Sequence, residues 1–304
     1  MSENDGFTYR EHLGPEAEGE ALLAYLCRRY RHTSSSDWRV RIERGDVRID
    51  AAAPGLNDRL RRGQRLEWRR PPWNEPDAPL HFDRLYEDDD VLAVGKPAGL
   101  PTLPGANFLQ STLLHQVRLE FKGATPVHRL GRFTSGVVLF AKTAEARAEL
   151  SRQLRAREIE KRYRALASGD PPWDAITVDR PIGPALHARL GTVYAAVPSG
   201  KPSSSRVEVL VRCRSSFLCD VWIATGRPHQ VRIHLAAVGH PLVGDPLYVA
   251  GGVPAADTQA LPGDPGYRLH AVEVAFRHPR TGRRVVVTAP SSDPMLDGRE
   301  PAHA

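Results

Sequence analysis

The spacing of apolar positions near the start of the chain predicts two short helices followed by small strands. Residues 1–17 are mostly polar and are expected to be loose. Apolar residues recur at helical spacing over 22–30, and the serines before Asp37 can serve as N-caps for a second helix that ends at the next glycine. Alternating apolar residues predict strands at 47–49 and 66–68. Together these elements predict one compact unit.

A proline-rich stretch at 71–76 is typical of an extended linker, and a longer pattern of short strands follows it. Thr143 can cap a helix that runs to about Arg157, and another helix is expected from Pro228 to Gly239. The strands predicted from apolar runs are 92–94, 137–141, 162–167, 217–224 and two between 269 and 289. Short strands of mixed spacing with few helices indicate an α+β domain rather than a parallel βαβ array.

The composition indicates a polyanionic partner. The formal net charge is +6 and the pI is about 9.4, which fits nucleic-acid binding. The three cysteines form no Cys-x-x-Cys pair, so we expect neither a disulfide framework nor a structural zinc site. Apolar runs of membrane-spanning length and a signal-peptide pattern are both missing from the sequence. We therefore expect a cytoplasmic protein with no membrane contact.

Four stretches of the larger unit stand out by their residue order. The first, 87–100, contains Lys-Pro-Ala-Gly at 96–99, and the second, 128–136, is His-Arg-Leu-Gly-Arg-Phe-Thr-Ser-Gly. The third, 161–165, is Lys-Arg-Tyr-Arg-Ala. The fourth joins Thr-Gly-Arg-Pro-His-Gln-Val-Arg-Ile-His-Leu at 225–235 to Gly-Asp-Pro-Leu-Tyr at 244–248. In this order and over this length they resemble the RluA-type pseudouridine synthases.

That resemblance implies a pseudouridine synthase fold, in which a mixed and mainly antiparallel sheet carries flanking helices. Residues 18–70 are similar in layout to the small α-L RNA-binding domain, an α/β unit that many family members carry before the synthase. The expected order is a flexible N-terminus at 1–17, the α-L-like domain at 18–70, a linker at 71–84, the synthase-like domain at 85–292 and a flexible C-terminus at 293–304.

The resemblance also implies a reaction, the isomerisation of uridine to pseudouridine in structured RNA, either ribosomal or transfer RNA. Such an intramolecular isomerase breaks the bond between uracil and ribose, turns the base and rejoins it through carbon. The family needs no cofactor and no metal for this. Because the base must leave its stack and enter a pocket, an aromatic ring can hold it there. RNA is thus the expected partner of a chain that we expect to be monomeric.

Two residues of the motifs match the family's catalytic pocket. Tyr163 suits stacking against the base, although without the motif a tyrosine that fills the core would be the simpler interpretation. Arg232 corresponds to the family arginine that pairs with the catalytic aspartate. It follows His229 at a spacing that puts both on one helix face. A solvent-facing arginine on an amphipathic helix is the alternative for Arg232.

Position 131 departs from the family pattern, because Gly131 stands where the family has its catalytic aspartate. The reaction needs a carboxylate, as nucleophile at the sugar or as base at the neighbouring carbon, and glycine supplies neither. A carboxylate from elsewhere, for example Asp245 or Asp220, would have to replace it, although Asp245 is otherwise expected to cap local backbone. The alternative function is a catalytically degenerate RNA-binding or assembly factor that retains the fold.

The candidate RNA contacts come from both units. In the larger unit they are His128, Arg129, Arg132, Arg227 and His229, and in the arginine-rich first unit they are Arg28, Arg29 and Arg44. Guanidinium groups bind phosphate oxygens in pairs, and such contacts are salt-sensitive. Solvated surface arginines and a structural His128 are the alternatives.

Other motif families fit the sequence less well. Residues 131–136 have the glycine spacing of a phosphate loop, but Val137 and Val138 follow where Lys and Ser or Thr are required. The segment 134–136 also lacks the Gly-x-Ser-x-Gly pattern of hydrolases. We expect no metal site.

Overall fold

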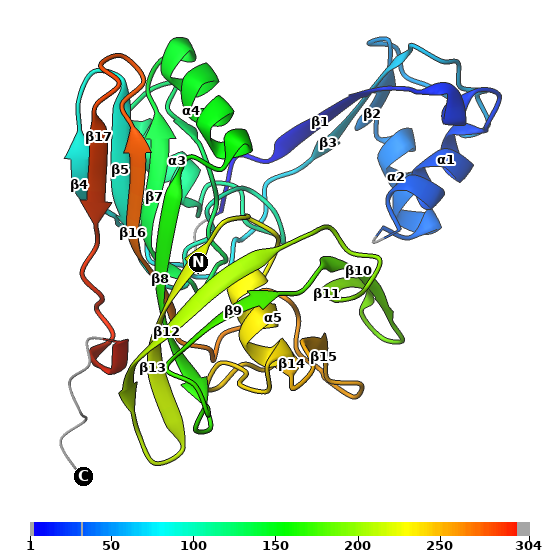
Figure 1. The fold of residues 1–304 in the computed structure, drawn as a ribbon. Coiled ribbons are helices and arrows are strands. Elements are labelled where there is room, and N and C mark those ends of the chain that lie inside the picture. Colours follow the sequence, from blue (N-terminus) through cyan, green and yellow to red (C-terminus); the bar gives the residue numbers. More distant parts are fainter. Residues whose placement is uncertain (1–2, 32, 297–304) are drawn as a thin grey trace. The chain divides into compact units, whose positions relative to one another are not determined.

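The computed structural model describes residues 3–31 and 33–296. The chain divides into two compact units, Met1–Glu75 and Pro76–Ala304 (Figure 1). The expected flexible C-terminus at 293–304 lies largely outside the described residues, and its first part contains the short 3-10 helix η2 (Pro294–Leu296). None of the described helices is long and apolar enough to cross a membrane.

The N-terminal unit is a three-stranded antiparallel sheet with two helices. Its elements are β1 (Phe7–His12), η1 (Pro15–Ala17), α1 (Leu22–Arg29), α2 (Ser35–Glu43), β2 (Val47–Ile49) and β3 (Arg65–Arg70), and the strand order is β1-β3-β2. Strand β1 corrects the expectation of a loose N-terminus. Residues 7–12 pair with β3 along their whole length, from Phe7 opposite Arg70 to His12 opposite Arg65. Backbone pairing holds this polar segment, which an apolar pattern does not reveal.

The two predicted helices of this unit are confirmed, and so is the serine cap of the second. Ser34 accepts a hydrogen bond from the backbone N–H of Asp37 at 3.1 Å. Helix α2 ends just before Gly45, whose φ of +76° favours glycine. The core of the unit includes Trp38 and Trp68, which meet edge to face with ring centroids 5.2 Å apart.

The C-terminal unit is built on a mixed sheet that has ten strands within the described residues. The strands run in the order β4-β5-β7-β16-β8-β13-β12-β9, with β17 paired to β16 and β6 paired to β7. Strands β7 and β16 are parallel, and the other pairs are antiparallel. The expectation of a mixed, mainly antiparallel sheet is therefore confirmed.

The bounds of these strands are β4 (Asp83–Glu87), β5 (Val91–Lys96), β6 (Thr125–Pro126), β7 (Ser135–Ala141), β8 (Glu160–Ser168), β9 (Ala175–Asp179), β12 (Ser204–Arg212), β13 (Ser216–Ile223), β16 (Leu269–Arg277) and β17 (Arg284–Thr288). Two small hairpins complete the unit, β10 (Ile182–His187) with β11 (Gly191–Ala196) and β14 (Tyr248–Val249) with β15 (Val253–Pro254).

Helices cover both faces of the sheet. Helix α4 (Ala144–Ala156) packs on β7 and β16 and buries Leu150 there. Helices α3 (Leu113–Glu120) and α5 (Gln230–Ala237) bury Val117 and Leu235 in the cluster on the opposite face. The side chains of β5 alternate between the two faces. Leu92 and Val94 pack in the cluster with α3 and α5, whereas Val91 and Ala93 pack in the cluster with α4.

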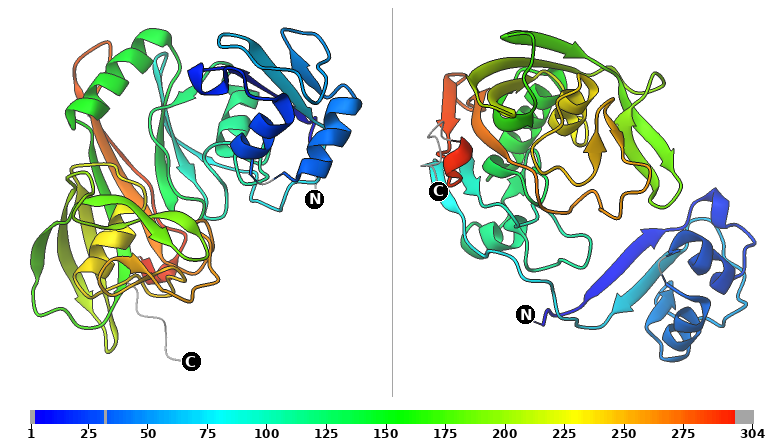
Figure 2. Two further views of the ribbon diagram at one scale, coloured as in Figure 1. Left: turned by 90° about the vertical axis from the view of Figure 1, so that its right-hand side faces the viewer. Right: turned by 90° about the horizontal axis from the view of Figure 1, so that it is seen from below.

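Helix α5 differs from its prediction in two ways. It begins at Gln230 rather than Pro228, because His229 adopts a left-handed φ of +55°. Nor does it have an exposed polar face, since every residue from Gln230 to Ala236 is buried. The helix packs against β13 and also against β11, β14 and β15 (Figure 2). Because these segments enclose the helix, the alternative of a solvent-facing Arg232 on an amphipathic helix is wrong.

Helix α3 and strands β9 to β12 have no counterpart among the predicted elements. These strands alternate between exposed and partly buried positions without a strong apolar run, as in β9, which buries only Val178. Pairing with neighbours in the fold, rather than local hydrophobicity, holds them in place.

Candidate functional site

Lys96 fixes the turn that precedes the candidate site. It ends β5 and is 1% exposed. Its ammonium group donates hydrogen bonds to the carbonyl oxygens of Pro97 and Leu100, both at 2.8 Å, and of Arg132 at 3.0 Å. Three carbonyls match the three N–H groups of an ammonium, while burial and the charge of Arg132 lower the pKa of Lys96 to about 7. Lys96 thereby ties the turn at 97–100 to the loop that contains Gly131.

Further hydrogen bonds hold the same loop. The hydroxyl of Thr102 donates to the carbonyl of Leu130 at 3.0 Å and accepts from its N–H at 3.2 Å. The backbone N–H of Gly99 donates to the carbonyl of Arg132 at 2.8 Å, and Arg132 Nε donates to the carbonyl of Gly99 at 3.0 Å. The φ of Gly99 is +92°, a conformation that favours glycine. The two motifs that begin with Lys96 and His128 therefore form one supported loop pair.

Gly131 lies exposed on this loop and points toward two hydroxyl groups. A Cβ atom added there would lie 3.2 Å from Tyr267 Oη and 3.3 Å from Thr134 Oγ1. These two hydroxyls are themselves 3.4 Å apart, and either can donate to the other. The backbone of Gly131 is outside the left-handed region, so the fold does not require glycine here. Residue 131 contributes no charge to the site.

Arg232 lies beneath the same tyrosine. It is 2% exposed, and its guanidinium lies 4.2 Å from the centroid of the Tyr267 ring. Arg232 Nε and one terminal nitrogen each donate to a different oxygen of Asp245, both at 2.7 Å. Burial alone would lower the pKa of Arg232, but the hydrogen bonds and charge of Asp245 outweigh it and raise the pKa. Tyr267 thus links Arg232 to the neighbourhood of Gly131.

Asp245 is the carboxylate that meets this arginine, and its side chain is 1% exposed. One of its oxygens also accepts the backbone N–H groups of Leu247 at 2.9 Å and Tyr248 at 3.0 Å. The expected capping role is therefore confirmed, together with an ion pair that the capping role alone did not predict. Both oxygens accept hydrogen bonds, three at Oδ1 and one at Oδ2, so Asp245 is a firmly held, buried partner of Arg232.

Tyr163 lies on β8 in the same apolar cluster as Leu130, Val231 and Tyr267. Its side chain is 7% exposed, and burial raises the pKa of its phenol well above the usual range. Its hydroxyl group has no hydrogen-bond partner in the described part of the chain. The structure therefore brings Arg232 and the loop of Gly131 together at Tyr267, and it places Tyr163 in the same apolar cluster.

Asp220 does not belong to this cluster. It accepts hydrogen bonds from Arg162 at 2.8 Å and from Arg164 at 2.9 Å. These two arginines flank Tyr163 on β8, so their side chains leave the sheet on the face opposite to Tyr163. Asp220 is thus on the wrong face to replace a carboxylate at position 131.

The two histidines of the motifs are held by hydrogen bonds and are neutral. His128 Nε2 accepts from the backbone N–H of Leu139 at 3.2 Å, while burial and the charge of Lys161 lower its pKa to about 3. His229 Nδ1 lies 2.8 Å from the hydroxyl of Tyr248, which itself donates to the carbonyl of Tyr194. Nδ1 of His229 is therefore the donor. Burial and the charge of Arg232 lower the pKa of His229 to about 4.

The motif arginines differ in how far they are engaged. Arg132 lies over the rings of Phe108 and Phe133, at 4.5 Å and 4.9 Å from their centroids. Arg129 is exposed. Arg227 donates to the carbonyl of Pro202 at 3.4 Å, and its buried Nε has no partner among the described residues. Arg129 and Arg227 are therefore the more available cations of the motifs.

The three arginines singled out in the N-terminal unit each meet an acidic residue. Arg28 pairs with Glu20 at 2.6 Å, Arg29 with Glu11 at 3.5 Å and Arg44 with Asp46 at 3.6 Å. Their side chains remain 46%, 55% and 63% exposed, respectively. Exposed pairs of this kind are weak, about 0–1 kcal/mol, so a phosphate can compete for each arginine.

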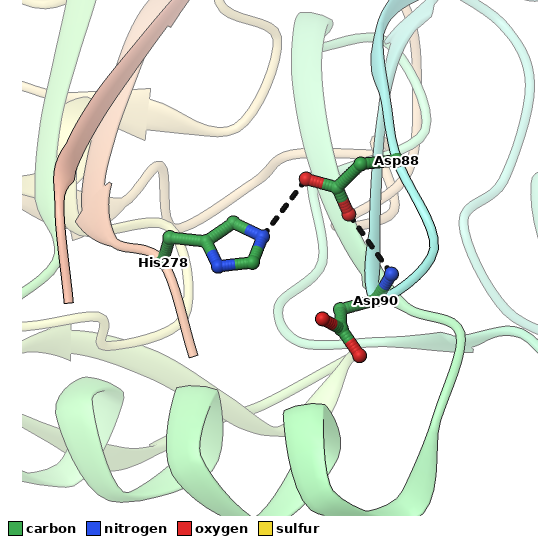
Figure 3. A group of neighbouring side chains, drawn as sticks. All are labelled: Asp88, Asp90 and His278. Atoms are coloured by element: carbon green, nitrogen blue, oxygen red, sulfur yellow. Dashed lines mark hydrogen bonds and ion pairs between the residues drawn. The ribbon is translucent and has the colours of Figure 1, made fainter. Parts of the chain in front are cut away.

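One cluster of potential metal ligands, Asp88, Asp90 and His278, lies at the end of the sheet remote from Lys96 (Figure 3). His278 Nδ1 accepts the backbone N–H groups of Arg280 and Thr281, so Nε2 carries the proton and donates to Asp88 at 2.8 Å. Arg280 binds Asp90 at 2.6 Å. Because these ligand atoms already have partners, the cluster is a closed hydrogen-bond network rather than an open metal site.

Sequence reasoning missed Tyr267, Lys96 and Lys161 as members of the site. Lys96 and Lys161 fall within the quoted motifs, so their positions gave a usable signal. Tyr267 has no such signal, because it follows a loop rich in glycine and proline and reaches the site only through the fold.

Comparison with known proteins gives a consistent result. Residues 90–237 match the family model described as RNA pseudouridylate synthase. An uncharacterised RNA pseudouridine synthase of Synechocystis is 39% identical over 271 residues, which cover 88% of this chain and 93% of the relative. RNA pseudouridine synthase 5 of Arabidopsis thaliana is 37% identical, with 97% and 95% covered.

Two further matches extend this. The ribosomal large subunit pseudouridine synthase D of Nitrosomonas europaea is 33% identical over 91% of this chain and 81% of the relative. Among solved structures, human RNA pseudouridylate synthase domain containing 1 superposes with a TM-score of 0.57 at 27% identity, covering 74% of this chain and 89% of that chain.

Proposed function

The chain belongs to the RNA pseudouridine synthase family, and we propose that it is an RluA-type member that isomerises a uridine in structured ribosomal or transfer RNA. The observation that carries this proposal is that Arg232 and the loop of Gly131 meet at Tyr267, with Tyr163 in the same apolar cluster. In a family member, this is the cluster expected to surround the reacting nucleotide.

In the proposed complex the uridine leaves its stack and enters the pocket beside Tyr163. Aromatic side chains hold everted bases by stacking, and the phenol of Tyr163 has a free hydroxyl to meet a polar edge of the base. Arg232 is held too firmly by Asp245 to move with the substrate. It therefore acts as a fixed positive charge beneath Tyr267.

The reaction breaks the bond between C1′ of the ribose and N1 of uracil and forms a bond between C1′ and C5. The proton on C5 leaves and N1 gains a proton, so the net change is an isomerisation. A carboxylate must assist, and Gly131 cannot. Asp245 is the carboxylate in contact with Arg232, so the proposal assigns this task to Asp245, which must first release part of its hydrogen bonding.

Pseudouridine mapping tests the activity directly. Total RNA from a strain that lacks the protein is incubated with the purified chain, and pseudouridines are mapped chemically beside RNA from the parent strain. We expect at least one uridine to be modified in the parent, unmodified in the deletion strain and restored by the protein. Identical maps in all three samples would contradict the proposal.

A second function, an RNA-binding or assembly factor that does not isomerise, is favoured by one specific observation. Both oxygens of Asp245 are occupied and Gly131 lacks a side chain, so the described site has no free carboxylate. This function predicts salt-sensitive binding to structured RNA with an unchanged pseudouridine map. Absence of RNA binding at low salt would exclude it.

The remaining expectations form part of the same proposal. Arg129, Arg132, Arg227, His128 and His229 would contact RNA around the pocket, and Arg28, Arg29 and Arg44 would add phosphate contacts from an α-L-like domain. The protein would act in the cytoplasm as a monomer, without metal or cofactor. The three cysteines are free thiols, which fits a reducing compartment.

A further inference from the structure

Lys161 is a buried cation on the pocket face of β8. It precedes Tyr163 by two residues, so both side chains leave the strand on the same face. Lys161 is 8% exposed. Its charge also lowers the pKa of His128, which belongs to the same motif as Gly131.

Within residues 3–31 and 33–296, the ammonium group of Lys161 forms no hydrogen bond or ion pair. Lys96, the other buried lysine of the site, instead donates three hydrogen bonds to carbonyl oxygens. A buried, unpaired ammonium is costly for a fold to keep. Burial accordingly lowers the pKa of Lys161. The ammonium group of Lys161 has no hydrogen-bonding role within the described chain, which points to a ligand.

An opening above Lys161 is provided by Gly226. This glycine is exposed, and a Cβ atom added to it would lie 3.5 Å from Lys161 Nζ. A larger side chain at 226 would therefore cover the ammonium, whereas the bare backbone leaves it accessible. Arg227 follows directly, with a buried Nε that has no partner in the described chain. The ammonium of Lys161 and the Nε of Arg227, neither of which has a partner in the described chain, thus belong to residues next to one exposed glycine.

The charge balance of the pocket favours an anion at this point. The charge of Arg232 is matched by Asp245, and Gly131 adds no negative charge. The charge of Lys161 is therefore uncompensated. An uncompensated positive charge attracts anionic groups, and RNA carries one on every phosphate.

We propose that Lys161, reached past Gly226, binds a backbone phosphate of the RNA next to the everted nucleotide. The inference rests on the proposed function, because it places RNA in this pocket. It adds a subsite that holds the sugar-phosphate chain while Tyr163 holds the base.

The first test is acylation of lysines by an amine-reactive reagent, read by mass spectrometry on the full chain. RNA from the deletion strain should slow acylation of Lys161 several-fold, and inorganic phosphate should slow it relative to chloride at the same ionic strength. Exposed Lys122 is the internal control and should react equally in all samples.

The second test is the dependence of RNA affinity on salt. Lys161→Met keeps the apolar stem and removes the charge, so the slope of log Kobs against log[salt] should fall by about 0.7–0.9, the value for one lost phosphate contact. Gly226→Val should produce the same fall by covering the ammonium, while Lys122→Met should leave the slope unchanged. Circular dichroism confirms that each variant is folded.

The outcomes separate this inference from the proposed function. The subsite is overturned and the function stands under three conditions together. Wild-type protein binds RNA, neither RNA nor phosphate slows acylation of Lys161, and Lys161→Met and Gly226→Val keep the wild-type salt slope. If wild-type protein does not bind RNA, the function fails, and the inorganic phosphate arm decides the subsite alone. Slower acylation of Lys161 in phosphate would then support an anion site, and an unchanged rate would overturn it.

Discussion

At residue 131 the backbone leaves room for a side chain. The nearest atoms to an added Cβ are the hydroxyls of Tyr267 and Thr134, at 3.2 Å and 3.3 Å, and each can shift by a few tenths of an ångström. Because the backbone conformation there suits any residue, an aspartate can be introduced without strain from φ.

Gly131→Asp is therefore expected to fold and to raise isomerisation. The new carboxylate would approach Tyr267 and the arginine beneath it, and a positioned acid or base contributes on the order of 10² to 10⁴ in rate. The measurement is pseudouridine formation in RNA from the deletion strain. Gly131→Asn, with the same shape and no carboxylate, is the control and should show no gain. Equal rates for the two variants would mean that position 131 does not face the reacting atoms.

Lys161 should also confer a pH dependence on RNA binding. Its folded pKa lies below the ordinary value, so the ammonium is present at low pH and is lost as pH rises through that lowered pKa. As pH rises, the salt slope of the wild-type protein should therefore fall to the slope of Lys161→Met. It should do so at a lower pH than if Lys161 had the ordinary pKa of a lysine. Salt titrations at several pH values measure this. Parallel slopes for the two proteins at every pH would contradict it.

At the scale of elements, the pair of Arg232 and Asp245 joins α5 to the loop before β14. The two side chains are 2% and 1% exposed, so either one alone would be an uncompensated buried charge. The hydrogen bonds from Leu247 and Tyr248 add to the role of Asp245 in this loop.

Asp245→Asn should lower the free energy of unfolding by about 3–5 kcal/mol, the usual cost of breaking a buried pair. Chemical denaturation measures it. Glu160→Gln is the matched control, because the pair of Glu160 and Arg284 is 62% and 54% exposed and should cost less than about 1 kcal/mol. If Asp245→Asn is as stable as the control, the buried pair does not stabilise the loop. The isomerisation activities of Asp245→Asn and Glu160→Gln are then compared at temperatures at which both variants are folded.

At the scale of the whole molecule, the basic charge is spread over both units, and much of it is paired. Arg28, Arg29 and Arg44 reach acidic neighbours only through exposed side chains, so their charge is available to RNA. Arg152, by contrast, is held by Glu149 and Glu158 together.

Replacing Arg28, Arg29 and Arg44 by glutamine should lower the salt slope of RNA binding by about 2–3, since each phosphate contact contributes about 0.7–0.9. Filter binding at several salt concentrations measures the slope. Arg152→Gln removes a paired charge from the other unit and should leave the slope unchanged. A triple variant with the wild-type slope would show that these arginines do not touch phosphate.

Strong local signals account for what could be predicted. The serine cap of α2, the threonine cap of α4 and the apolar runs of β5 and β7 were readable, because each depends on neighbouring residues. Strand β1 was not, because its partner β3 is distant in the sequence. The β10–β11 hairpin was not, because it lacks a strong apolar run. In the candidate site Tyr163 and Arg232 followed from motifs, whereas Tyr267 did not.

The order of motifs along the chain determined the family, the α+β class and the lack of a carboxylate at residue 131, because these are properties of residue identity and spacing. Only the tertiary structure decided that Asp245, and not Asp220, meets Arg232, and that Lys161 is buried without a partner. Such facts depend on which sheet face a strand presents and on which loops enclose a helix. Packing between residues distant in the sequence determines the sheet face and the enclosing loops, and no pattern of neighbouring residues encodes that packing.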